Sequence, residues 1–453
     1  MTILSYVLAF LVAIGVLVAV HEYGHFWMAR RLGIRVLRFS IGFGKPLWSR
    51  RGADGTEYAV SAIPLGGYVK LLDEREGPIE PSQLAEAYNR KPVWARILVL
   101  LAGPFANFLF AVLAYWVLFV AGVPALKPVL GEVTADSPAA QAGLRAGDEI
   151  VAVGQRETGT REAAVLAVLD ELMNGGSIEL QLRDADGNVR GAALRVEADR
   201  RALTEPGALL PGLGFDFWYP VVPAVVGNVV PGSPAERAGL REGDAIVAVD
   251  GQAVSNFAGL VAQVQPKPGA RLAFTIERQG TRLSIPVEVE SQREGERLVG
   301  RIGVQPAPSG ALPEEMRTRE RHGPFGALVR ATDKTWDMSV LTVRMLWNVA
   351  TGDVSVKNLS GPINIAEYAG FSARQGILAF LSFLAIVSVS LFVLNLLPIP
   401  ILDGGQIVYQ LAELAKGSPL SERTQAVGQQ IGILLLLVLM SFAFYNDLSR
   451  LFS

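Results

Sequence analysis

Cysteine is absent from the sequence of 453 residues, and only three histidines occur in it. Without cysteine the chain cannot form a disulfide, bind zinc through a thiolate or use a thiol as a nucleophile. Charge is also scarce, because charged residues make up 19% of the chain and the formal net charge is −2. This composition gives no overall reason to expect binding to nucleic acid. A transition-metal site would have to be built from histidine and carboxylate side chains.

Half of the residues are apolar, and four uncharged apolar stretches cover residues 3–20, 97–123, 377–402 and 431–445. A transmembrane helix needs about 20 apolar residues, which the first three stretches supply and the fourth reaches with its flanks. No basic residue precedes the first stretch and no small-residue cleavage site ends it, so we expect a retained helix rather than a signal peptide. The sequence therefore predicts four transmembrane helices.

The distribution of basic residues predicts how these helices are oriented. Lysines and arginines gather between the first and second stretches, from Arg30 to Arg96, so this loop should be cytoplasmic. The N-terminus, the long region 124–376 and the C-terminus would then lie outside the cytoplasm. In this topology the first and third helices run in the same direction, toward the cytoplasm.

The long middle region contains an internal repeat. The segments GEVTADSPAAQAGLRAGDEIVAV (131–153) and GNVVPGSPAERAGLREGDAIVAV (227–249) align without gaps. Each copy reads as a strand, a helix that begins at Ser-Pro-Ala, and a Gly-Asp turn into a second strand. The pattern resembles bacterial PDZ domains, which commonly receive an extended peptide as an added strand. Binding of peptide ends, gating of substrates by size and a role as spacers all stay open.

The sequence HEYGH at the end of the first apolar stretch is the strongest candidate for chemistry. On a helix, His21 and His25 lie four residues apart on one face, so both imidazoles can bind one metal ion. Glu22 is placed to reach a water molecule at that metal and act as a general base. Surface histidines on an ordinary helix are the alternative. However, ionisable groups at membrane depth are costly and usually functional, which favours a zinc site.

A catalytic zinc normally has three protein ligands, so one more is needed. His322 is predicted on the far side of the membrane. Asp403 lies about 25 residues into the third span, and His21 and His25 lie about 19 and 23 residues into the first. At 1.5 Å per residue these depths agree within about one turn. We therefore predict Asp403 as the third ligand, with an interfacial turn residue beside Gly404-Gly405 as the alternative.

Two prolines precede Asp403 in this span. Pro398 and Pro400 must break the helix because proline lacks the backbone N–H that an interior helical position donates. Irregular backbone at membrane depth is tolerated only where protein or a water-filled cavity surrounds it. A hydrolytic site needs such a cavity.

Three motifs carry a resemblance to a known family. HEYGH (21–25), AGPFANF (102–108) and NLLPIPILDGG (395–405) together match the site-2 protease family of intramembrane zinc metalloproteases. With paired PDZ domains between the second and third helices, the chain resembles the regulator of sigma-E (RseP-type) branch along essentially its whole length. The resemblance implies one Zn²⁺ per chain, bound by His21, His25 and Asp403, with Glu22 as the catalytic base.

The resemblance also implies the substrates and the location. The enzyme would lie in the bacterial inner membrane, with its active site near the cytoplasmic side and its PDZ domains and both termini on the periplasmic side. It would cut a peptide bond in or near the transmembrane helix of single-span membrane proteins, and so regulate an extracytoplasmic stress response. The implied substrates are an anti-sigma factor after a first cut and remnant signal peptides.

Substrate-binding residues follow from the same resemblance. Asn395 matches a family asparagine that contacts the substrate backbone, with an interhelical hydrogen bond as the alternative. The first cytoplasmic loop resembles the family's membrane-reentrant β-element, whose edge can pair with an unwound substrate, although an ordinary hairpin stays open. In that loop the candidate residues are Gly42, Gly44, Tyr58, Val60, Gly66 and Gly67.

The expected fold is a multi-pass α-helical membrane protein with four transmembrane helices and two extracytoplasmic α+β PDZ domains inserted between helices 2 and 3. The expected boundaries are helix 1 with HEYGH at 1–26, the cytoplasmic loop with the β-element at 27–96, helix 2 at 97–123, PDZ domains at 124–220 and 221–310, an amphipathic segment at the outer membrane surface at 311–376, helix 3 at 377–402, a cytoplasmic loop at 403–428 and helix 4 at 429–447. Simple packing is the alternative for the amphipathic segment.

Two other classes of function compete with a protease. A catalytically silent PDZ scaffold would hold membrane partners, but the intact Glu22 disfavours it. A metal transporter could use the same ligands, but the third span offers a single acid rather than a relay of polar groups across the membrane.

Overall fold

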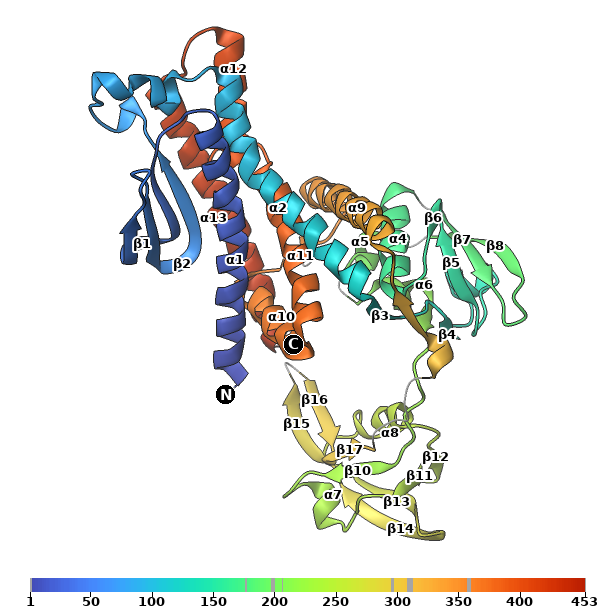
Figure 1. Ribbon diagram of the computed structural model, residues 1–453. Coiled ribbons are helices and arrows are strands. Elements are labelled where there is room, and N and C mark those ends of the chain that lie inside the picture. Colours follow the sequence, from blue (N-terminus) through green and yellow to red (C-terminus); the bar gives the residue numbers. More distant parts are fainter. Residues whose placement is uncertain are drawn as a thin grey trace. The chain divides into compact units, whose positions relative to one another are not determined.

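The computed structural model describes residues 2–175, 177–196, 200–205, 207–294, 297–307, 313–356 and 360–452. The chain divides into two compact units, whose elements are labelled in Figure 1. The helical unit comprises Met1–Ala125, Glu197–Leu209 and Arg319–Asp447, and the β unit comprises Leu126–Val196, Leu210–Thr318 and Leu448–Ser453. This division separates the four apolar stretches of the sequence from its internal repeat.

The helices of the helical unit are α1 (Thr2–Arg31), α2 (Val93–Ala121), α5 (Arg200–Leu203), α9 (Pro324–Thr351), α10 (Pro362–Gln375), α11 (Ile377–Asn395), α12 (Asp403–Lys416) and α13 (Glu422–Phe452). Within the described residues, four of them, α1, α2, α11 and α13, are long and apolar enough to cross a membrane. Each contains most or all of one predicted apolar stretch. The prediction of a multi-pass membrane protein is confirmed at this level.

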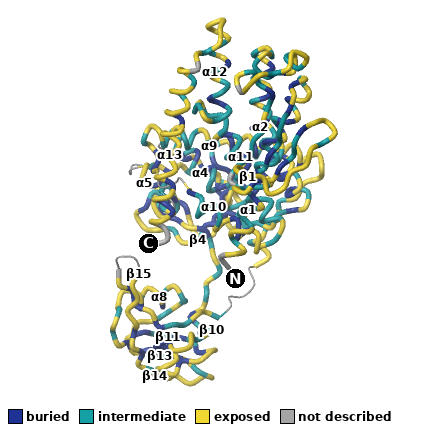
Figure 2. The backbone as a smooth tube through the Cα atoms, turned by 90° about the vertical axis from the view of Figure 1, so that its left-hand side faces the viewer, coloured by how far each residue is buried: buried dark blue, intermediate teal, exposed yellow. Residues whose placement is uncertain are grey.

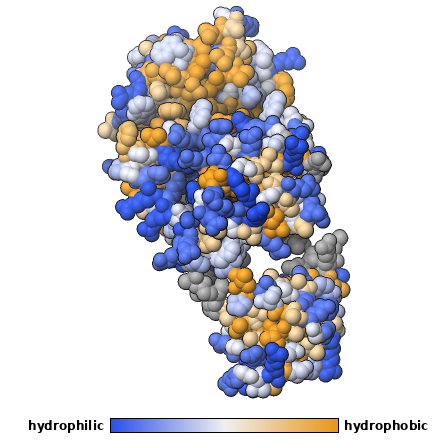
Figure 3. All heavy atoms as spheres, turned by 90° about the vertical axis from the view of Figure 1, so that its right-hand side faces the viewer, coloured by the Kyte–Doolittle hydropathy of each residue, from blue (hydrophilic) through white to orange (hydrophobic). Residues whose placement is uncertain are grey.

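The surface of these helices suits lipid rather than water. On α13, Leu434 and Leu437 are 63% and 59% exposed, and Leu4 and Leu8 of α1 are 75% and 61% exposed. Figure 3 shows apolar surface gathered in the upper part of the picture, where the transmembrane helices lie. Large exposed apolar faces are costly in water but not against acyl chains, which are as apolar as leucine.

Helix α2 is the scaffold of the helical unit, because it packs against α1, α9, α11 and α12. Its large side chains Tyr115, Leu118 and Phe119 are buried against alanines of α9 and α11, including Ala327 and Ala385. Alanines let the helix backbones approach closely, which is how helices gain packing energy in a membrane.

The third span differs from its predicted bounds. Helix α11 ends at Asn395, seven residues before the predicted end at 402, and residues 396–402 form turns before α12 begins at Asp403. The physical cause is the pair of prolines in this stretch, as predicted. The predicted cytoplasmic loop 403–428 therefore contains a helix of 14 residues.

The loop between α1 and α2 contains a curled antiparallel hairpin of β1 (Val36–Arg51) and β2 (Glu57–Leu71), followed by three short 3-10 helices, η1 (Glu74–Glu76), η2 (Pro81–Glu86) and η3 (Tyr88–Arg90). Both strands bend, so the pairing continues around the curl. Residues 36–41 pair on one side with 67–71 and on the other with 57–60, and 57–61 also pair with 46–51. The free edges of this sheet are therefore 46–51 and 67–71.

The β unit gives the two repeat copies the same local architecture. The first copy contains β4 (Leu130–Val133), α3 (Pro138–Gln141), β5 (Glu149–Val153), β6 (Arg156–Glu157), α4 (Arg161–Asn174), β7 (Ser177–Arg183), β8 (Val189–Arg195), α6 (Leu209–Leu213) and β9 (Phe215–Phe217). The second contains β10 (Val226–Val229), α7 (Pro234–Arg237), β11 (Ala245–Val249), β12 (Gln252–Ala253), α8 (Phe257–Val264), β13 (Arg271–Arg278), β14 (Thr281–Glu288), β15 (Glu290–Glu294), β16 (Arg297–Arg301) and β17 (Val304–Pro306).

The main sheets of the copies have the matching strand orders β6-β5-β7-β8 and β12-β11-β13-β14. In each copy a serine caps the short helix after the first strand, with Ser137 accepting from the Ala140 N–H and Ser233 from the Glu236 N–H. Phe274 and Ile276 on β13 are fully buried in the core of the second copy, and Figure 2 shows buried residues along β11 and β13. The remaining strands, β3 (Val123–Leu126) and β18 (Arg317–Glu320), pair with each other.

Candidate metal centre

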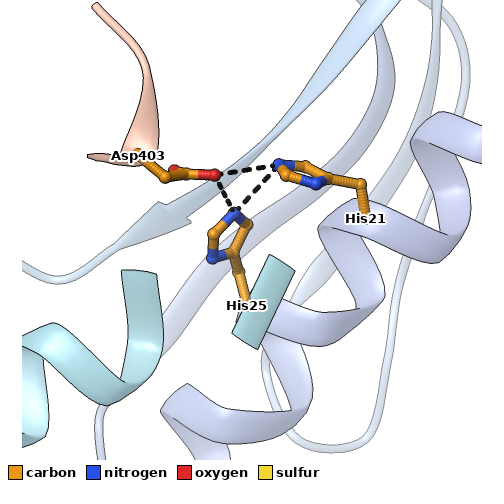
Figure 4. A group of neighbouring side chains, drawn as sticks. All are labelled: His21, His25 and Asp403. Atoms are coloured by element: carbon orange, nitrogen blue, oxygen red, sulfur yellow. Dashed lines mark hydrogen bonds and ion pairs between the residues drawn. The ribbon is translucent and has the colours of Figure 1, made fainter. Parts of the chain in front are cut away.

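The two histidines of HEYGH project from one face of α1 toward the start of α12. Nε2 of His21 lies 3.2 Å from Nε2 of His25, and these nitrogens lie 3.2 and 3.5 Å from Oδ2 of Asp403 (Figure 4). The three side chains are largely buried, with 12–17% of their surface exposed. The structure therefore brings together the three residues that the sequence singled out as a metal-ligand set.

The spacing of these three atoms suits zinc. Tetrahedral zinc with ligand bonds of about 2.0–2.1 Å separates its ligand atoms by roughly 3.3–3.4 Å, close to the three distances observed. Oδ2 of Asp403 is buried and has no well-formed hydrogen bond in the described part of the chain. A buried anionic oxygen without a donor is costly, and a cation between it and the two imidazoles would satisfy it.

The ring of His25 is held in the orientation that a metal needs. Its Nδ1 lies 2.7 Å from the backbone carbonyl oxygen of Val99 on α2. Because a carbonyl can only accept, this bond puts the ring proton on Nδ1 and leaves the lone pair of Nε2 free. The free lone pair points toward His21 and Asp403.

Glycines allow the helices to pass close to the metal-ligand set. A methyl group on Gly103 would overlap the imidazole of His25, and one on Gly24 would overlap the carbonyl of Ala102. Only glycine lets α1 and α2 approach this closely at the depth of the histidines.

The start of α12 is set by the Gly404-Gly405 pair. A methyl group on Gly404 would overlap the carbonyl of Leu396, and one on Gly405 would overlap the carbonyl of Ile399. The turn 396–402 can therefore fold back over the first turn of α12. Asp403 occupies that first turn, where the helix dipole favours a negative charge.

Glu22 lies beside the metal-ligand set and is 8% exposed. Its carboxylate interacts electrostatically with His21, His25 and Asp403. The hairpin packs against it at Gly67, where a Cβ atom would lie 2.9 Å from Cγ of Glu22 and 2.7 Å from the carbonyl oxygen of Ser40. Gly67 therefore packs directly against the side chain of Glu22, the candidate base.

The other predicted substrate-binding residues lie in different elements of the helical unit. Asn395 is half-buried and is the last residue of α11, eight positions before Asp403. Gly42 and Gly44 lie in β1 with positive φ angles of 93° and 86°, where the strand bends, and Gly66 lies in β2 with a φ of 148°. These conformations favour glycine for backbone reasons alone.

Tyr58 and Val60 lie in the inner part of the curled sheet. Tyr58 pairs with Phe39 on one side and Arg50 on the other, and Val60 pairs on both sides as well. Their backbones are already paired on both sides, so a substrate strand would have to pair elsewhere on the sheet. Their predicted role in binding substrate stays a prediction. The ring of Tyr58 also packs against Phe26 of α1, so it helps to hold the sheet on that helix.

Two polar contacts near the site were not predicted from the sequence. Asn107 of α2 is fully buried and places its amide 3.4 Å from Nδ1 of His21. Arg96, at the start of α2, makes a bidentate ion pair with Glu413 of α12, with N···O distances of 2.6 and 3.1 Å. A polar side chain within an apolar span is a sequence signal that could have found Asn107.

Comparisons with known proteins find a family model and relatives that match almost the whole chain. The family model described as "Peptidase family M50" matches residues 9–439. The chain is 45% identical over 450 residues to the "Regulator of sigma-E protease RseP" of Escherichia coli K12, covering 98% of both chains. It is 44% identical over the full length of the "Regulator of sigma E protease" of Salmonella typhi. A protein of Vibrio cholerae named "Putative zinc metalloprotease" is 40% identical over 98% of both chains.

Proposed function

The chain belongs to peptidase family M50, and we propose that its active site is the group His21, His25, Asp403 and Glu22 where α1, α2 and α12 meet. The protein is a zinc-dependent metalloprotease of the inner membrane. It is an intramembrane protease that regulates the sigma-E response, and relatives that match its whole length are named regulator of sigma-E protease. The observation that carries the assignment of residues is the near-equilateral triangle of ligand atoms, with sides of 3.2, 3.2 and 3.5 Å.

In this proposal His21, His25 and Asp403 hold the zinc ion, which supplies the Lewis acidity that lowers the pKa of a water molecule toward 7 and polarises a carbonyl group. Glu22 takes the proton from the attacking water and passes it to the nitrogen of the leaving amine. The carboxylate is suited to this exchange because it is buried beside the ligands and walled in by Gly67.

The substrates we propose are single-span membrane proteins, such as an anti-sigma factor after a first cut, and remnant signal peptides. A transmembrane helix hides its peptide bonds, so cleavage needs a locally extended segment. The free edges 46–51 and 67–71 offer backbone groups for strand addition, and the second edge begins at Gly67 beside Glu22. Asn395 would contact the backbone of the same segment.

The sidedness and the middle region are part of the same proposal. We place the hairpin and the active site toward the cytoplasm and both termini and the β unit in the periplasm, because basic residues gather around the hairpin. The two repeat copies would be PDZ domains that bind peptide ends or limit access by size. Their matching strand orders and serine-capped helices support this reading.

The test is cleavage of a single-span substrate by the purified full chain in detergent with zinc, comparing wild type with Glu22→Gln. Loss of the base should lower the rate at least about 100-fold while zinc stays bound. Glu80→Gln, at an exposed position after the hairpin, is the matched control and should cleave like wild type.

Zinc content separates the outcomes. His21→Ala and His25→Ala should lose zinc, whereas His322→Ala, which changes the third histidine of the chain, should keep it. Equal cleavage by wild type and Glu22→Gln would remove Glu22 as the base. Zinc retention by the His21 and His25 variants would remove the proposed metal site.

A further inference from the structure

One face of α2 contacts both histidines of the metal-ligand set and the helix that carries Asp403. Arg96, Val99, Gly103 and Asn107 follow at spacings of three, four and four residues, so they form one stripe, and all four are buried. Arg96 pairs with the helix that begins at Asp403, Val99 accepts from His25, and Gly103 leaves room for the His25 ring. Asn107 completes the stripe beside His21.

Asn107 has no evident reason to be polar apart from this contact. It is fully buried in an apolar helix, where an amide is costly unless it is hydrogen bonded. Ser388 of α11 donates to its backbone carbonyl at 2.9 Å, a bond that any residue could accept. The contact of its side chain is with Nδ1 of His21, at 3.4 Å from Nδ2, and Oδ1 has no hydrogen-bond partner among the described residues.

The geometry at His21 decides which end of the amide is needed. Nε2 of His21 faces His25 and Asp403, so Nδ1 is the nitrogen that points away from the ligand set. When Nε2 binds a metal ion, the ring proton must sit on Nδ1, and that N–H needs an acceptor. A half-turn of the Asn107 amide brings Oδ1 to the position that Nδ2 occupies and supplies that acceptor.

We propose that Asn107 is the positioning residue for His21: its amide oxygen accepts from Nδ1–H and so keeps the lone pair of Nε2 directed at the zinc ion. This inference rests on the metal site proposed above. It gives His21 the counterpart of the Val99 carbonyl that orients His25. Both orienting groups come from the same stripe of α2, so the two imidazoles are fixed relative to one rigid helix.

The test measures zinc affinity in the full-length Glu22→Gln protein, by competition with a chromophoric chelator, so that cleavage plays no part. Asn107→Leu keeps the size of the side chain but removes the acceptor, and should weaken zinc binding roughly 10- to 100-fold. Asn107→Asp keeps an acceptor and should bind zinc within a few-fold of the parent. Ser388→Ala, which changes the packing around Asn107 without touching His21, is the control and should also bind normally.

The outcomes are distinct. Weak binding by Asn107→Leu with recovery by Asn107→Asp supports the proposal. Equal affinities of Asn107→Leu and the parent overturn it, as do equal losses in Asn107→Leu and Asn107→Asp. If Asn107→Leu does not fold, Asn107→Ala takes its place against the same aspartate variant. Failure of the metal site itself would appear separately, as normal zinc binding by His21→Ala.

Discussion

Asp244 of the β unit is a buried acid and Asp403 of the helical unit is a largely buried one, yet the surroundings of their carboxylates differ. Asp244 is 1% exposed and accepts hydrogen bonds from the Arg241 N–H at 2.8 Å and from two nitrogens of Arg278 at 2.7 Å. Oδ2 of Asp403 instead faces two imidazole nitrogens and has no well-formed hydrogen bond within the described residues. The carboxylate of Asp244 is fully hydrogen bonded within the fold, whereas that of Asp403 would gain its partner from the zinc ion in the proposed metal site.

The internal repeat shows that a buried acid paired with an arginine, such as Asp244, has a structural role. In the first copy, Asp148 accepts from the Arg145 N–H and from Arg190 on β8. In the second, the equivalent Asp244 is paired by Arg278, which comes from β13. Each arginine also donates to the carbonyl of the glycine in the Ala-Gly-Leu segment. The two arginines come from different strands but make the same contacts. The Gly-Asp turn therefore requires an acid that is paired with an arginine, whether or not a ligand binds.

The largest difference should appear when each acid becomes an amide. Asp403→Asn removes an anionic ligand, so zinc affinity should fall by more than the 10- to 100-fold typical of losing a group that only orients a ligand. Cleavage of a single-span substrate should be lost with it. Asp244→Asn keeps its hydrogen-bond acceptor and should retain zinc and cleavage. Metal analysis and a cleavage assay on both full-length variants check this, and normal zinc content in Asp403→Asn would contradict it.

The sequence was most informative where local spacing or depth determines geometry. His21 and His25 share a face because they lie four apart on a helix, and Asp403 was found because its depth in a parallel span matches theirs. The prolines before Asp403 also predicted a break in the helix, although α11 ends at Asn395 and not at the predicted residue 402. These features depend on helix rise and backbone chemistry, which a single sequence contains.

The contacts that hold the metal ligands in place could not be predicted from local spacing or depth in the sequence. The pairing of Arg96 with Glu413 joins residues 317 positions apart, and nothing in either local pattern selects the other. The alternation around Tyr58 and Val60 predicted a strand, but such a pattern does not show which neighbours the strand pairs with. Asn107 was overlooked although the argument used for Asn395, a polar group in an apolar span, applies to it equally.

A smaller effect should follow when the paired acid loses its partner. Arg278→Met leaves the Asp244 carboxylate buried with the Arg241 N–H as its remaining donor among the contacts described, which should cost about 1–3 kcal/mol of local stability. Amide hydrogen exchange of β11 in the full chain should then speed up roughly 5- to 150-fold. Strand β5 of the first copy, whose acid keeps its arginine, is the internal control. Unchanged exchange in β11 would mean that the pair does not stabilise this copy.

The smallest effect concerns pH. Burial raises the pKa of the Asp244 carboxyl, but hydrogen bonds from the Arg278 guanidinium and the Arg241 N–H outweigh it, so its pKa lies below the usual value. A carboxyl with a lowered folded-state pKa stabilises the fold fully above its unfolded pKa of about 4, and this stabilisation is lost as pH falls through the lower folded value. Exchange protection of β11, corrected for the intrinsic exchange rate, should therefore decrease below about pH 4. In Asp244→Asn that decrease should be weaker, because no proton is taken up at this position, and identical pH profiles would show that other carboxyls control the acid response.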